Sequence, residues 1–147
     1  MRRLASGIIV LAMSIALAPA AGASLLSKTF EFKNAVTLEV GAANQDGLRL
    51  DTVRFQLPSP SNSRWLPSGR TVNVQVALSN TTDKSMKVGI AVALFDEGGR
   101  LVGAATGGTK LMPIKPGRQK IYKLVFDGAN GDAYLAKTFQ ISVETKP

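Results

Sequence analysis

The chain has 147 residues, of which 18 are basic and 10 acidic, and its formal net charge is +8. It contains no histidine and no cysteine, which excludes a Ser-His-Asp triad, a Cys-His pair, histidine ligation of metals and disulfide bonds. The basic residues form no dense run, so their scatter favours solubility as the role of the charge, and we expect no nucleic-acid partner. Contact with anionic envelope material or a glycan is the alternative.

The first 23 residues read as a signal peptide. Arg2 and Arg3 precede an apolar run over 4–17, and small residues follow up to Ala23. We expect cleavage between Ala23 and Ser24, and a periplasmic or secreted mature domain over 24–147 with no membrane span. Without Arg2 and Arg3, 16 basic and 10 acidic residues leave that domain a net charge of +6. The alternative is a retained anchor, but the run is short of the ~20 residues that a bilayer span needs.

Apolar and polar residues alternate over most of the remaining chain. Residues 30–40 predict one long or bent strand, and 44–47 predict a turn. In 48–57 the apolar positions change parity, which predicts a bulge near Asp51–Thr52 or two short strands. The proline-rich segment 58–69 predicts a loop that carries Arg64 and Trp65. These two could stack on a ligand, although a capping role for the tryptophan is favoured.

Further strands are predicted over 72–78, 86–94, 100–106, 121–126 and 139–143, with a turn signal between each pair. About seven strands at this spacing indicate an all-β, immunoglobulin-like sandwich of two antiparallel sheets. A small closed barrel is the alternative architecture.

Residues 70–127 resemble the FxLYD-type domain, an immunoglobulin-like module of exported bacterial proteins. The resemblance rests on the strand 72–76, on Asn80 in the next turn, on the run 92–103 and on the Pro116-Gly117 pair. Val92 and Phe95 stand at the positions of the name-giving Phe and Tyr. The resemblance implies the fold and an exported location, and it implies no reaction.

The segment from Val92 to Gly99 predicts a tight hairpin. A three-residue loop over 97–99 would pair Leu94 with Val102, Val92 with Ala104 and Ile90 with Thr106 on the inner face. The outer face would then pair Phe95 with Leu101, Ala93 with Gly103, Ala91 with Ala105, and Gly89 with Gly107. We expect this flat face of small residues to be covered by the segment 25–32, by a second copy of the chain, or by a protein partner. The alternative is that small side chains are simply tolerated there.

The sequence offers no catalytic residue, cofactor site or metal site that we expect to be used. Asp127, Asn130 and Asp132 raise a calcium interpretation, but their spacing fits a hairpin turn better. We therefore predict a non-enzymatic module with a structural or protein-interaction role. A binder of anionic envelope material is the alternative, and an enzyme with an unusual site is a third.

Overall fold

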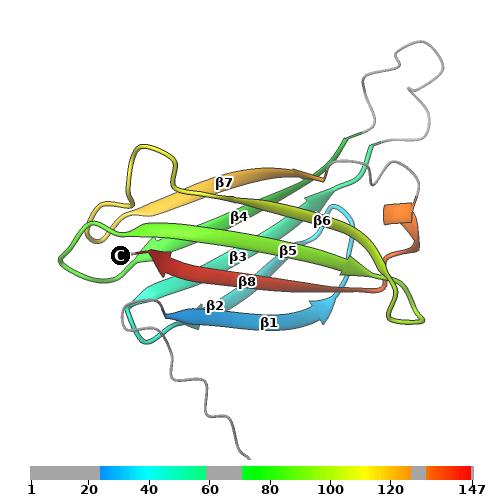
Figure 1. Cartoon of the computed structure of the whole chain (residues 1–147), viewed down its shortest axis with the longest axis horizontal. Coiled ribbons are helices and arrows are strands. Elements are labelled where there is room, and N and C mark those ends of the chain that lie inside the picture. The colour runs from blue at the N-terminus through cyan, green and yellow to red at the C-terminus, as the bar shows by residue number, and fades with distance from the viewer. Residues whose placement is uncertain (1–23, 59–70, 127–131, 147) are drawn as a thin grey trace, which may run out of the picture.

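The computed structural model describes residues 24–58, 71–126 and 132–146, and they form two antiparallel sheets of four strands packed face to face (Figure 1). Sheet A has the order β1 (Leu25–Glu31), β8 (Thr138–Lys146), β5 (Lys87–Phe95) and β6 (Leu101–Gly108). Sheet B has the order β2 (Thr37–Ala43), β3 (Leu48–Gln56), β4 (Val72–Asn80) and β7 (Gln119–Phe126). The predicted two-sheet sandwich is confirmed, and the closed barrel is not found.

Helical structure is confined, within the described residues, to the short 3-10 helix η2 (Asp132–Leu135). No helix in the described part of the chain has the length and apolar character needed to cross a membrane.

The alternating apolar residues of both sheets point into one interior. Every second residue of β4 and β5 is fully buried, as the period-two pattern predicts. At one end of the core the ring of Phe55 lies 4.8 Å from that of Phe139 and 6.3 Å from that of Phe126. Rings at these separations pack favourably beyond the area that they bury.

The change of parity in 48–57 indicated either a bulge or two short strands, and the structure shows a bulge in β3. The register between β3 and β4 shifts between Leu50 and Thr52, so one extra residue enters β3 there. Leu50 and Val53 therefore both face the core, and Asp51 lies on the outer side of sheet B.

The prediction of one strand over 30–40 is wrong. The chain forms β1 in sheet A, leaves it after Glu31, and enters sheet B as β2. Between them Ala35 has a left-handed backbone with φ 59°, and its amide donates to the Phe55 carbonyl at 3.0 Å. The apolar positions keep even numbers on both sides of this break, so alternation gave no sign of it. This division raises the count from about seven strands to eight.

The predicted register of the β5–β6 hairpin is correct only at its end. Phe95 pairs with Leu101, but the register then shifts, and Leu94 pairs with Gly103. Val102 is the additional residue in β6, and it is buried. The shift turns Ala105 toward the core opposite Val92, with 5% of its surface exposed. Ala105 is therefore not part of the outer face, and Ala104 and Thr106, which were expected on the inner face, lie exposed opposite Ala93 and Ala91.

One long side of the sandwich is less closed than the other. Between β1 and β2 an apolar cleft of about 110 Å³ is lined by residues that include Phe30, Val36 and Leu38. On the other side β6 packs against β7, and the Thr109 and Tyr122 hydroxyls lie 3.2 Å apart.

Candidate functional site

The predicted binding residues of the hairpin lie on the outer face of sheet A. We call this surface the small-residue face. Its outward residues are Leu25, Ser27, Thr29 and Glu31 of β1, Thr138, Gln140, Ser142 and Glu144 of β8, Lys87, Gly89, Ala91, Ala93 and Phe95 of β5, and Leu101, Ala104 and Thr106 of β6. The charged members, Glu31, Glu144 and Lys87, lie at or near the ends of their strands. Four of the five hairpin residues predicted to bind are therefore together on one surface, and Ala105 is replaced by its neighbours Ala104 and Thr106. Arg64 and Trp65 lie outside the described residues.

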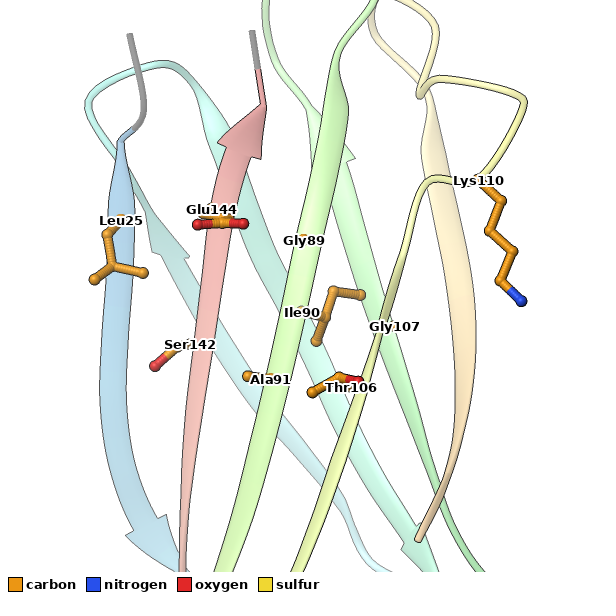
Figure 2. Close-up of a pocket in the computed structure, with 9 residues that line it drawn as sticks. All are labelled: Leu25, Gly89, Ile90, Ala91, Thr106, Gly107, Lys110, Ser142 and Glu144. Atoms are coloured by element: carbon orange, nitrogen blue, oxygen red, sulfur yellow. The ribbon is translucent and has the colours of Figure 1, made fainter. Parts of the chain in front are cut away.

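The small side chains make this face hollow rather than flat. A depression of about 570 Å³ is lined by residues of β1, β8, β5 and β6 and by Lys110 (Figure 2). A second depression of about 260 Å³ shares Ala91, Thr106 and Ser142 with the first. Together they form a shallow groove across the strands, because alanine, glycine and serine leave space between the longer side chains around them.

Neutral hydrogen-bonding groups lie at the β8 side of the groove, where Gln140 and Ser142 of the lining contact Ser27 of the neighbouring edge strand β1. The Ser27 and Ser142 hydroxyls lie 2.9 Å apart, and the Gln140 amide donates to the Ser27 hydroxyl at 3.0 Å. The charged residues of the lining, Glu144 and Lys110, belong to the larger depression alone. Such a surface can recognise a partner by shape and hydrogen bonds, but it presents no pair of groups suited to proton transfer.

The segment 25–32 does not cover this face, which corrects one of the three expected occupants. Most of that segment is β1, which pairs edge to edge with β8, from Leu25 opposite Glu144 to Glu31 opposite Thr138. Pairing satisfies its backbone donors and acceptors, which a segment lying across the face could not achieve.

Asp96, one of the few acids near the hairpin, holds the turn. One carboxylate oxygen accepts from the amides of Gly98 at 3.0 Å and Arg100 at 2.9 Å, and the other accepts from the Arg100 guanidinium at 3.1 Å. The Arg100 backbone hydrogen bond is the main cause that lowers the pKa of Asp96 below its ordinary value. This carboxylate therefore stabilises the hairpin in its charged form.

Asp51 is the centre of a polar cluster that sequence reasoning did not find. On the outer side of sheet B its carboxylate accepts hydrogen bonds from Ser79, from Gln119 at 2.8 Å and from the Arg49 guanidinium at 2.6 Å. Burial raises the pKa of Asp51, but the three hydrogen bonds and the charge of Arg49 outweigh it, and the net shift is downward. The only sequence signal here was the bulge, because the partners come from three different strands.

The described residues contain no group of three or more Asp, Glu, His or Cys side chains arranged to hold a metal ion. Asp132 of the calcium interpretation is described, whereas Asp127 and Asn130 lie outside the described residues.

No protein-family model matches the chain, and no curated protein matches it.

A second surface was also not anticipated from the sequence. Residues 109–118 connect sheet A to sheet B at one end of the sandwich (Figure 1), and together with the first two residues of β7 we call 109–120 the basic loop. They contain four cations, Lys110, Lys115, Arg118 and Lys120, and no acid. The sequence does carry a signal of this basic surface that was not used, since no acidic residue occurs from 98 to 126.

Proposed function

We propose that the protein is an exported, non-enzymatic module that binds another protein through the small-residue face. The observation that carries this proposal is the shallow groove across sheet A, which is lined by uncharged residues over β8, β5 and β6 and reaches Glu144, Lys110 and the β1 residue Leu25 in its larger depression. The centres of protein interfaces are depleted of charged residues, and this face has the same character.

The remainder of the surface supports this choice of face. The outer side of sheet B presents charged residues such as Arg49, Arg54 and Lys123, whereas β5 presents Gly89, Ala91 and Ala93. A partner that covers the β5 residues displaces water from backbone and methyl groups without stripping a charge of its hydration. A partner of largely neutral, extended surface fits the groove best.

Export is part of the proposal. It rests on the signal-peptide pattern of residues 1–23 and on the FxLYD-type resemblance over 70–127, both of which stay predictions. Ser24, the expected first residue after cleavage, donates its backbone amide to the Thr145 hydroxyl at 3.2 Å. Cleavage before Ser24 would leave this contact in place. N-terminal sequencing of the protein recovered from the envelope or medium should begin at Ser24.

Photo-cross-linking from the centre of the face tests the proposed interaction. A photoreactive amino acid at Ala93 should give an adduct with another protein in the native envelope, whereas one at Gln75 of β4 should not. Ala93→Arg should abolish the adduct of a probe at Ala91, and Gln75→Arg should preserve it. Adducts between two copies of this chain, together with a doubled mass in sedimentation, would replace the separate partner by a homo-oligomer. Equal labelling from Ala93 and Gln75 would contradict the proposal.

A second candidate function is binding of anionic envelope material. The observation that favours it is the gathering at one end of cations that are scattered in the sequence: those of the basic loop, Lys84 in the β4–β5 turn and Lys87 at the start of β5. Retention on an anionic polymer that falls steeply with salt concentration would support this function.

A further inference from the structure

The tip of the basic loop exposes two large apolar side chains side by side in sequence. Leu111 is 92% exposed and Met112 is 74% exposed. Two residues further on, Ile114 is fully buried in the core. The chain therefore buries one apolar residue of this loop and leaves the other two in water, where they contribute nothing to folding.

The exposure of the tip is fixed by the anchoring of its base. Met86 and Ile114 exchange two backbone hydrogen bonds of 2.9 and 2.8 Å, and the Asn80 amide donates to the Ile114 carbonyl at 3.0 Å. At the tip the Lys120 ammonium donates to the Met112 carbonyl at 2.9 Å. With its base held in this way, the loop leaves Leu111 and Met112 exposed to solvent.

Cations surround the apolar tip. Lys110, Lys115 and Arg118 are exposed, and a depression of about 510 Å³ beside the tip is lined by Met112, Ser85, Lys115 and Arg118 among others. The acids at this end are Asp83, beside Lys84 in the β4–β5 turn, Asp46, which is hydrogen-bonded to Thr145, Glu144, which lines a depression with Lys110, and Asp51, which is bonded to Arg49 and Gln119. The cations outnumber these acids, so the field at the tip attracts anions.

We propose that the basic loop docks the protein on an anionic lipid bilayer, with Leu111 and Met112 inserted among the acyl chains and the surrounding cations on the lipid phosphates. This inference deepens the second candidate function and names its ligand as an anionic lipid surface. It is independent of the small-residue face, which lies on the outer side of sheet A.

An anionic lipid surface fits both halves of this site. A bilayer accepts apolar side chains just below a layer of negative headgroups, which is the order of groups that the loop presents. An anionic glycan would use the cations but leave the adjacent Leu111 and Met112 in water. A protein pocket could accept the apolar pair, but it would have to supply a ring of acids around that pocket as well.

Vesicle binding by paired variants tests the inference. All variants carry the same N-terminus, so any contribution of that end cancels. Binding is measured by flotation with vesicles of equimolar phosphatidylglycerol and phosphatidylcholine. The double variant Leu111→Ser/Met112→Ser should bind at least about tenfold more weakly than the parent. The matched control is Ile121→Ser/Val125→Ser, which removes two exposed apolar side chains from the outer side of sheet B and should bind as the parent does.

A second pair of variants tests whether vesicle binding requires the cations of the basic loop. Lys115→Gln/Arg118→Gln should lose about 30-fold in affinity, since each cation near an anionic surface contributes about fivefold. The control Lys33→Gln/Lys137→Gln removes the same charge elsewhere on the surface and should change binding little. Equal losses in both pairs would show that net charge alone acts, and would overturn the assignment of the loop.

Dextran sulfate and phosphatidylcholine vesicles separate the lipid inference from the broader function. Dextran sulfate binding should be insensitive to Leu111→Ser/Met112→Ser. If the protein binds dextran sulfate but the apolar double variant binds anionic vesicles as the parent does, the lipid inference fails and the anionic-material function stands. Binding to neither probe would refute both. Equal binding to phosphatidylcholine vesicles would refute the role of the cations.

A direct measurement of insertion is available because the chain has no cysteine. Met112→Cys can be labelled at one site with an environment-sensitive fluorophore, with Ile121→Cys as the control. We expect anionic vesicles to shift the emission of the label at 112 to the blue and to leave that at 121 unchanged. An unshifted label at 112 under conditions of complete vesicle binding would overturn the insertion of the tip.

Discussion

The Asp51 carboxylate on β3 and the Gln119 amide on β7 are joined by a hydrogen bond of 2.8 Å that passes over β4. With the bonds from Ser79 and Arg49, this contact links β3, β4 and β7 on the outer side of sheet B. The pKa of Asp51 is held below 3.8, so its contribution to stability is fully present above that pH and is lost as the pH falls through the lowered value. We expect Asp51→Asn to lower the free energy of unfolding at neutral pH by about 1–2 kcal/mol.

The difference between parent and Asp51→Asn should shrink as the pH falls below 3.8, because protonation removes the same charge from the parent. Urea unfolding at a series of pH values measures this. Asp83→Asn, at an exposed carboxylate of the β4–β5 turn, is the control and should show no such pattern. A constant difference at every pH would mean that the charge of Asp51 is not what stabilises the sheet.

Neighbouring alanines of β6 report the register of the hairpin. Ala105→Asp places a charge in the core beside Val92, so we expect it to cost about 3 kcal/mol or more. Ala104→Asp lies on the exposed outer face and should change stability by less than about 0.5 kcal/mol. Thermal unfolding of the two variants measures the contrast, and the reverse order would indicate the regular hairpin without the shift at Val102.

The buried Asn80 connects the β4–β5 turn to the basic loop. Its amide donates to the carbonyls of Lys84 at 2.6 Å and Ile114 at 3.0 Å. Asn80→Asp keeps the shape but turns an oxygen toward these carbonyls, which should cost about 2–3 kcal/mol. Asn73→Asp, where the amide has one weaker contact with Thr71, should cost much less. Denaturant unfolding compares the two, and equal losses would show that Asn80 is not a specific anchor.

Gly108 lies at the closest approach of β6 to β5. Its φ is +137°, and an added Cβ would lie 2.2 Å from the Val88 carbonyl oxygen. Gly108 ends β6 opposite Gly89, and the Thr109 amide holds the same Val88 carbonyl at 2.9 Å, so neither backbone can move away freely and Gly108→Ala should cost at least about 3 kcal/mol. At Gly117 the φ is +62° and a Cβ would meet no atom within 4 Å, so Gly117→Ala should cost about 1 kcal/mol. Calorimetry on both variants separates steric conflict from backbone strain.

The alternation of apolar and polar residues predicted which side chains form the interior, because a strand with one buried face has an apolar residue at every second position. The change of parity between Leu50 and Val53 indicated either a bulge near Asp51–Thr52 or two short strands, and the structure shows the bulge. Alternation did not predict the bulge in the β5–β6 hairpin, because the extra residue there changes no parity that the sequence shows. At the β5–β6 hairpin, Ala104 and Ala105 fit either face equally well, so only the backbone contacts decide which one is buried.

Sites that depend on distant partners could not be predicted in this way. The partners of Asp51 lie two residues away at Arg49 but also 28 and 68 residues away at Ser79 and Gln119. In the basic loop the sequence shows three apolar residues, and the pairing of Met86 with Ile114 determines that Ile114 is the buried one. Only the cations of that loop were visible beforehand, as a stretch without acids.

The cleft between β1 and β2 gives the two sheets unequal freedom to separate. On the β6–β7 side, side chains of both sheets are in contact. On the other side the Asn44 amide donates to the Ser24 carbonyl before β1 and the Asp46 carboxylate accepts from the Thr145 hydroxyl of β8 at one end, whereas at the other end the chain crosses through Ala35 and the space beside Phe30 stays open. A small outward rotation of sheet A about the β6–β7 side would widen this cleft and wet the rings of Phe55 and Phe139 without breaking a ladder within either sheet. The aromatic end of the core is thus the part of the interior that water can reach with the least rearrangement.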